Sequence, residues 1–302
     1  MMNSDTATCL SLSQPQDVAP GTQTCGPFLE NQVFTRANGT VVSGTRAPFP
    51  NTIGSDGYFV NMGNSNYNGL ELTAKKTMGR LSLLASYTYS KSLDWSSNLQ
   101  EQVNPYNYRQ EYGLSAFDIR NDFVASYNYE LPFDRVFRDR KRLTQGWTIS
   151  GITRFASGVP VTFASLGDNA LMNVQNNGVN GISIDLPDVM PGNLDINNNP
   201  RNGLSEFNTS LFSPNMLGTQ GNASRRFFAG PGIENFDIAL HKITRITESK
   251  LLELRFETFN TLNHAQFYGA SAVDGNIDDP NFGQITKADN PRFVQIAAKF
   301  SF

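Results

Sequence analysis

Seven segments of the chain alternate apolar and polar residues with a period of two, which is the pattern of β-strands with two unlike faces. They span residues 70–75, 81–90, 122–131, 147–155, 236–241, 252–257 and 292–302. In the last segment one side carries Val294, Ile296, Ala298, Phe300 and Phe302. The pattern predicts an all-β protein whose C-terminal strand ends on an aromatic residue.

The polar side of the sixth segment carries three charges in succession, Glu253, Arg255 and Glu257. These charges would be costly in a dry β-sandwich core but harmless in solvent or in a wet lumen. As lumen-facing candidates they could line a solute path, or they could form cross-strand pairs that fix the register. Alternation alone therefore allows either a sandwich or a barrel.

The lengths of the connections favour the barrel. Residues 78–80, 132–146 and 244–249 form short connections, whereas residues 91–119, 158–235 and 263–291 form long ones. Short and long connections alternate, as in outer-membrane barrels with short periplasmic turns and long extracellular loops. We therefore predict an antiparallel up-and-down transmembrane β-barrel segment, with membrane strands and long loops in residues 67–302. Residues 1–66 are predicted to be an extracellular loop region with a hairpin around Asn38 and Gly39.

Composition agrees with a β protein and indicates no nucleic-acid partner. The 24 basic and 27 acidic residues give a net charge of -3, so nothing indicates nucleic acid as a partner. Aromatic residues at 11% and 25 glycines favour strands and turns over helices. The chain contains no apolar run of about 18 residues, the length that a transmembrane helix needs.

The only cysteines, Cys9 and Cys25, lie in a segment rich in Pro, Gly and Thr. They are disulfide candidates in an oxidising compartment, or two unpaired thiols. The N-terminus lacks the basic region and apolar core of a secretory signal.

No motif in the sequence indicates catalysis or a cofactor. His241 and His264 lie in different segments without metal-site spacing, which predicts no metal centre. Asp195, Asn197 and Asn199 loosely resemble a calcium loop, but an ordinary Asn/Gly-rich loop explains them as well. Five loop aromatics could contact a ligand or pack the loops onto themselves, namely Trp95, Tyr106, Tyr108, Phe207 and Phe212.

Several motifs in order along the chain resemble one family. They are F-D-I-R-N-D-F (117–123), G-W-T-I-S-G-I-T-R-F-A-S-G-V-P (146–160), G-N-A-S-R-R-F-F-A-G-P-G-I-E-N-F-D (221–237), R-F-E-T-F-N-T-L-N-H (255–264), N-F-G-Q-I (281–285) and the ending from residue 291. Together they resemble the C-terminal part of TonB-dependent outer-membrane receptors. Within this family, the motifs look most like those of the Oar-like, carboxypeptidase-regulatory-domain-bearing receptors found in Acidobacteria. The resemblance implies a barrel of about 22 strands that is filled by an N-terminal plug and imports a solute.

The chain has room for only about seven membrane strands. About fifteen strands, the plug, the TonB-contacting segment and the regulatory domain of such a receptor would lie outside it. We therefore expect the C-terminal segment of a longer protein in the bacterial outer membrane, inactive alone and without catalysis. Its expected partners are outer-membrane lipid, the barrel-assembly machinery, the TonB complex through the missing plug, and an unidentified small-molecule or oligomeric solute.

Two other interpretations remain open. The chain could be a complete small barrel of about eight strands that acts as a pore or an anchor, with residues 53–60 supplying another strand. It could also be a soluble all-β binding module such as a lectin-like sandwich.

Overall fold

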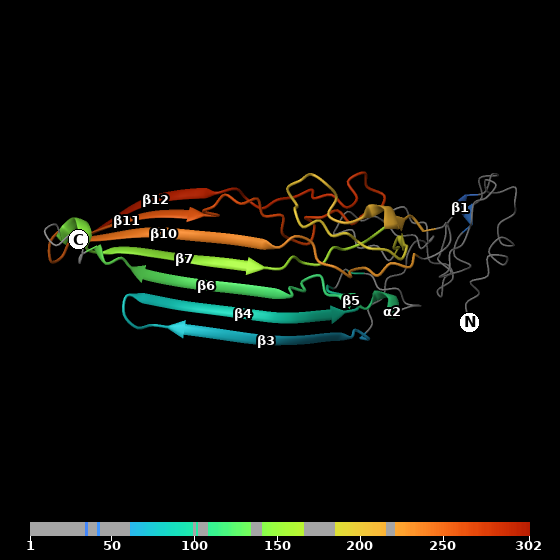
Figure 1. Cartoon of the computed structure of the whole chain (residues 1–302), viewed down its shortest axis with the longest axis horizontal. Helices are drawn as coiled ribbons and strands as arrows, with labels where there is room; N and C mark the ends of the chain where they lie inside the picture. Colours follow the sequence, from blue (N-terminus) through green and yellow to red (C-terminus); the bar gives the residue numbers. More distant parts are fainter. Residues whose placement is uncertain are drawn as a thin grey trace.

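One antiparallel sheet forms the body of the protein (Figure 1). The computed structural model describes residues 34–35, 41–42, 61–98, 101, 108–133, 141–165, 185–215 and 221–302. The seven long strands of the sheet are β3 (Ser65–Lys76), β4 (Leu81–Asp94), β6 (Asn121–Glu130), β7 (Trp147–Ala156), β10 (Ile233–Arg245), β11 (Leu251–Phe259) and β12 (Phe293–Ser301). Their order, β12-β11-β10-β7-β6-β4-β3, follows the chain, so the predicted up-and-down antiparallel fold is confirmed.

Smaller elements lie outside this sheet or at its border. The short strand β5 (Gly113–Leu114) pairs with the end of β4, and β8 (Asp188–Val189) pairs with β9 (Phe212–Ser213). The predicted N-terminal hairpin is present as β1 (Phe34–Thr35) paired with β2 (Val41–Val42). The helical turns are α2 (Tyr108–Glu111), α4 (Lys141–Thr144) and η1 (Thr209–Leu211). Among the described residues, no helix is long and apolar enough to cross a membrane.

The connections sort to the two ends of the sheet as the sequence predicts. The short turns after β3, β6 and β10 lie at the end that also carries the C-terminus, which we call the short-turn end (Figure 1). The long connections after β4, β7 and β11 lie at the opposite, long-loop end. Gly146 shows why a short turn needs glycine: its φ is +76°, and a Cβ there would collide with the carbonyl oxygen of Ile243.

Strand register divides the sheet into an apolar face and a polar face. The apolar face carries, among others, Leu70, Leu72, Leu83, Tyr87, Phe123, Tyr127, Ile149, Phe155, Phe236, Leu240, Leu254, Phe256, Ile296 and Phe300. The polar face carries, among others, Glu71, Lys75, Ser86, Thr88, Ser126, Asn128, Ser150, Arg154, Asp237, His241, Glu253, Arg255 and Glu257. Leu72, Leu254 and Ile296 are 55%, 44% and 78% exposed, so no second layer among the described residues covers these parts of the apolar face. This arrangement differs from a sandwich, in which two apolar faces pack together, and matches a strand surface that faces lipid.

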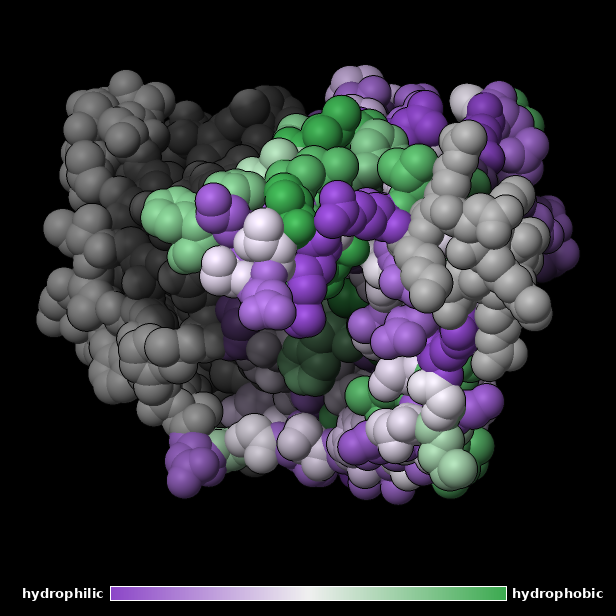
Figure 2. Space-filling model, turned by 90° about the vertical axis from the view of Figure 1, so that its left-hand side faces the viewer, coloured by the Kyte–Doolittle hydropathy of each residue, from purple (hydrophilic) through white to green (hydrophobic). Residues whose placement is uncertain are grey.

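The sheet is curved but open. Figure 2 looks along the strands from the short-turn end and shows the described side chains curving around a hollow. A cavity of about 480 Å³ lies against the sheet and is lined by polar-face residues from Lys75 on β3 to Glu257 on β11. Strands β3 and β12 are the two edges and do not pair with one another. The described part of the chain is therefore an arc of a barrel with its polar face inward.

One glycine explains a break in the alternation of β7. Gly151 lies on the apolar face between Tyr127 of β6 and Ile238 of β10. A Cβ at Gly151 would come within 2.7 Å of the Tyr127 hydroxyl oxygen, so the tyrosine ring lies over the glycine. The ring therefore covers the gap that the missing side chain would leave.

Candidate functional site at the long-loop end

The three long connections fold together into one body, which we call the loop assembly. It comprises the described parts of residues 95–120, 157–232 and 260–292. Isolated bridges join Pro160 to Ala229 and Ala164 to Asn276, and the Phe163 amide donates to the Arg225 carbonyl at 2.8 Å. Backbone hydrogen bonds of this kind hold loops far apart in sequence in a single arrangement.

The loop assembly contains the hydrophobic core of the described residues. Its buried members are Val161, Phe163, Phe207, Phe212 and Val273. Phe163 stacks on Phe212 with ring centroids 4.9 Å apart, and Phe207 meets Phe163 edge-on at 5.5 Å. Phe207 and Phe212 thus pack the loops onto themselves, the second of the two roles that the sequence left open.

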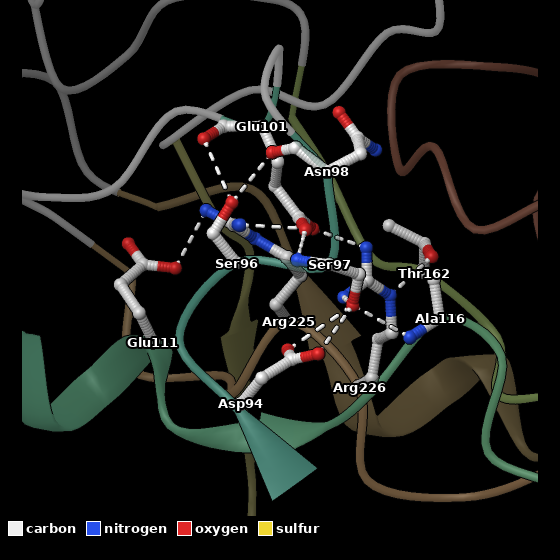
Figure 3. Close-up of polar contacts among 10 residues, drawn as sticks. All are labelled: Asp94, Ser96, Ser97, Asn98, Glu101, Glu111, Ala116, Thr162, Arg225 and Arg226. Atoms are coloured by element: carbon white, nitrogen blue, oxygen red, sulfur yellow. Dashed lines mark hydrogen bonds and ion pairs between the residues drawn. The ribbon is translucent and has the colours of Figure 1, made fainter. Parts of the chain in front are cut away.

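A cluster of buried charges lies beside this core (Figure 3). Arg225 Nη1 lies 2.9 Å from Glu101 Oε1, and Arg225 Nη2 lies 2.6 Å from Glu111 Oε2. Arg226 forms a second ion pair with Glu101. All four side chains are at most 3% exposed. The cluster links the connection after β4, which supplies both glutamates, to the connection after β7, which supplies both arginines.

Neutral groups complete the coordination of Arg226 (Figure 3). Its Nε donates to Thr162 Oγ1 at 2.8 Å and its Nη1 to Ser97 Oγ at 3.3 Å. Ser97 in turn donates to Asp94 Oδ2 at 2.9 Å, at the end of β4. The guanidinium is therefore tied to the rim of the sheet as well as to the loops.

The electrostatics of the cluster favour its ionised form. Burial opposes ionisation of Glu101, but the adjacent Arg225 and Arg226 outweigh this effect and lower the pKa of the carboxyl group. Burial lowers the pKa of Arg226, and the Glu101 carboxylate partly offsets that change. Buried charges of opposite sign at these distances act as a clamp between the loops.

A second feature of the site is a cavity of about 750 Å³ where the loop assembly meets the sheet. Tyr87, Phe123 and Phe155 of the apolar face form one wall. Loop residues form the other walls, namely Ile196, Asn197, Asn198, Asn199, Pro200, Arg201, Glu206, His264, Ala265, Gln266 and Phe267. Its volume and its mixture of aromatic and polar groups are typical of small-ligand sites.

Glu206 is an unusual member of this lining. The residue is 2% exposed, and its Oε2 has no hydrogen-bond partner among the residues that the structure describes. Its backbone is fixed on both sides, because its amide donates to Gly283 O at 2.7 Å and its carbonyl accepts from the Asn197 amide at 2.7 Å. Burial raises the pKa of the Glu206 carboxyl to about 7.

The site residues predicted from sequence lie as follows. Val294, Ile296, Ala298 and Phe300 share the apolar face of β12, and the 92%-exposed Phe302 follows at the short-turn end. Their proposed part in barrel assembly stays a prediction.

The three charges of β11 share the polar face. Glu253 pairs in register with Lys299, Arg255 with His241 and Glu257 with Ala239. Arg255 Nε lies 2.5 Å from Glu253 Oε1, so two of the charges neutralise each other along the strand. His241 lies on the same face, with its Nε2 3.0 Å from Ser150 Oγ.

The remaining candidates are separated from these sites. In the loosely calcium-like loop, side chains bond within the loop: Asn193 Nδ2 donates to Asp195 Oδ1 at 2.5 Å, and Asn197 Oδ1 accepts from the Asn199 amide at 3.0 Å. Trp95 stacks on Tyr108 at 5.2 Å. Cys9, Cys25, Tyr106 and residues 53–60 lie outside the described residues. Within the described ranges, no three His, Cys, Asp or Glu side chains are grouped to hold a metal ion.

Sequence reasoning missed the two features that organise the site. Arg225 and Arg226 stand within the motif at 221–237, but no role was predicted for either of them. The sequence does contain a signal for a buried ion pair, because two successive arginines stand directly before two phenylalanines. Charges in an apolar setting need partners of opposite charge. Nothing in the sequence near Glu206 indicated that it would be buried.

The curved sheet with an apolar outer face and a polar inner face defines the class of protein: a segment of an outer-membrane β-barrel. Comparison with known families agrees. The chain belongs to the family described as outer membrane beta barrel domain, whose model matches residues 9–295. Its location is therefore the bacterial outer membrane. No curated protein and no solved structure matches the chain.

Proposed function

We propose that this chain is the C-terminal barrel portion of a TonB-dependent outer-membrane receptor that imports a solute. The open sheet carries the proposal. Its strands follow chain order from β3 to β12, and the two end strands do not pair with each other. The sequence motifs that resemble TonB-dependent receptors support the choice among large barrels.

Two open edges are incompatible with a finished structure in lipid. Strand β3 has 12 residues and β12 has 9, each with one side that has no partner in the described sheet. Every unsatisfied backbone group in the hydrocarbon region costs several kcal/mol, so membrane-spanning sheets close into barrels. In this proposal, strands from other parts of a larger receptor pair with β3 and β12 in the membrane.

The parts of the chain take distinct roles in this proposal. The loop assembly lies outside the cell and contributes to solute capture, while the polar face of the sheet lines the lumen. The plug of such a receptor couples to the TonB complex and releases the solute inward. The barrel-assembly machinery recognises β12, and outer-membrane lipid surrounds the apolar face. The chain catalyses no reaction.

A photo-crosslinking residue on the edge strand tests the proposal. With such a residue in place of Leu72 on β3, irradiation of intact cells should join the chain to a peptide from outside these 302 residues. The matched control is the same residue in place of Ile149 on β7, which should crosslink within the chain, to β6 or β10. Crosslinking of position 72 to residues 53–60 or to β12 would instead show a complete small barrel.

The import step needs its own test. Bacteria that produce the receptor and bacteria that lack it are compared for depletion of solutes from the medium. We expect one class of solute to be depleted only by the producing cells, and only while the proton gradient is intact. Equal depletion after the gradient is collapsed would contradict TonB coupling and leave a passive pore.

A further inference from the structure

The cavity of about 750 Å³ lies on the boundary between the lipid-facing surface and the loops. Phe123 and Phe155 belong to the apolar face and stand within two residues of the ends of β6 and β7 at the long-loop end, and Tyr87 of β4 pairs in register with Phe123. Aromatic residues at this height form the interfacial girdle of an outer-membrane barrel. The opposite walls are loop residues, most of them polar, with Ile196, Pro200, Ala265 and Phe267 as apolar members. A ligand here would contact an apolar surface and a polar surface at once.

The charges around the cavity nearly balance. Glu206 and Glu234 supply two carboxyl groups, while Arg201 supplies a guanidinium group and His264 an imidazole ring. His264 Nδ1 lies 3.8 Å from Glu234 Oε2, so this pair is largely self-contained. The lining therefore has no strong field of one sign that would select a cation or an anion. It suits an uncharged ligand that forms many hydrogen bonds.

Glu206 supplies a specific need for such a ligand. Its Oε2 is buried and has no partner among the described residues, and a buried acceptor without a donor is costly. A ligand hydroxyl could donate to it once a rotation of the carboxyl group brings Oε2, which is closed to solvent here, to the cavity surface. Aromatic rings alongside provide flat apolar surfaces for the carbon skeleton of a ring.

We propose that this cavity binds the saccharide headgroup of an amphiphile in the outer leaflet, with the acyl chains lying along the apolar face below it. We choose a membrane amphiphile over a free sugar because the aromatic wall of the cavity continues into the lipid-facing surface. The site is separate from the lumen. The inference relies on the outward orientation of the long loops in the proposed function, and not on solute import.

The test uses the full chain in micelles of a zwitterionic detergent that carries no sugar. Three probes are added in turn: an alkyl maltoside, an alkyl phosphocholine with the same tail, and maltose. Hydrogen exchange of residues 196–201 reports binding. We expect the alkyl maltoside to protect this segment at concentrations at which the other two probes do not.

Two variants make the result specific. Glu206→Met removes the acceptor and keeps a side chain of similar length, and it should weaken the response to the alkyl maltoside at least about tenfold. Because the replaced carboxyl has no described partner, the fold should survive this change. Asp195→Asn alters an acid of the same loop outside the cavity lining and should leave binding unchanged.

Each contrary result has a definite meaning. No protection by the alkyl maltoside, or equal protection by the phosphocholine, would overturn the saccharide assignment. Equal protection by maltose would overturn the membrane amphiphile and leave a site for free sugar. A full response in Glu206→Met would remove the assigned role of Glu206. None of these outcomes depends on TonB, so failure here is distinguishable from failure of the proposed import.

Discussion

Removal of Arg225 should release the connection after β4 from the connection after β7. The side chain is 2% exposed and contacts Glu101 and Glu111 at 2.9 and 2.6 Å. Arg225→Ala deprives both buried carboxylates of this cation, and breaking a buried pair from one side costs about 3–5 kcal/mol. This cost corresponds to a rise of roughly 10² to 10⁴ in the opening constant of the loops.

Hydrogen exchange of the chain in detergent micelles measures this opening. The informative amides are Phe163, which donates to Arg225 O at 2.8 Å, and Leu114, which donates to Arg226 O at 3.3 Å. Both should exchange faster in Arg225→Ala, while the central amides of β6 and β7 keep their protection. A change below about fivefold, or an equal loss in the strands, would refute the clamp.

Two further variants separate charge from packing. Arg154→Ala removes an ion pair to Asp122 that is 3.0 Å long and about a third exposed, at 33% and 28%, together with a contact to the face of the Tyr268 ring. Exposed pairs contribute about 0–1 kcal/mol, so this control should hardly affect exchange. The double variant Arg225→Met with Glu111→Leu removes one charge of each sign and should recover part of the loss, because apolar pairs often replace buried ion pairs without cost.

The other predictions concern the lipid face, one turn and Glu206. Ile296→Arg or Leu254→Arg should reduce the amount of protein in outer membranes, at about 2–4 kcal/mol near the midplane, whereas Gln295→Arg should be mild; equal effects would contradict the face assignment. Gly146→Ala should destabilise the turn before β7 by at least about 1 kcal/mol in urea unfolding, because φ is +76° there, while Gly63→Ala in open space should not. Burial raises the pKa of Glu206 from 4.5 to about 7, because it penalises the ionised carboxylate; the loops are therefore most stable below about pH 4.5 and lose at most about 3 kcal/mol as the pH rises through 7. Exchange of residues 204–212 should show that loss, and Glu206→Gln should abolish the pH dependence.

The strands and their order were predictable because they depend on local patterns. Alternation is set by the two-residue period of a strand, so Leu254 and Glu253 reveal their faces without any knowledge of neighbours. The alternation of short and long connections then gives the direction in which each strand crosses the membrane, because short turns are periplasmic and long loops extracellular. Even Gly151, which interrupts the pattern, leaves β7 intact because Tyr127 of the neighbouring strand covers it.

The loop assembly was not predictable in the same way. Its contacts join residues more than a hundred positions apart, such as Arg225 and Glu101, and no period relates them. Phe207 and Phe212 appeared equally suited to ligand contact or to packing, and only their burial decided between the two roles. The backbone amide of Glu206 donates a hydrogen bond to the carbonyl oxygen of Gly283, which belongs to the connection after β11. This contact between distant segments could not be read from the sequence around Glu206.

Two sets of contacts hold the loop assembly together at the long-loop end: the buried charges and the aromatic core. The buried charges join the first two long connections to the rim of the sheet, through Arg226, Ser97 and Asp94. The aromatic core joins the second and third connections, because Phe163 and Phe207 both contact Phe282. A loop assembly fixed in both ways can hold a preformed cavity at the membrane boundary, since its walls come from the second and third connections and from β4, β6 and β7. If the clamp holds that wall in place, Arg225→Ala should weaken alkyl maltoside binding without any contact between Arg225 and the ligand, whereas Arg154→Ala should not.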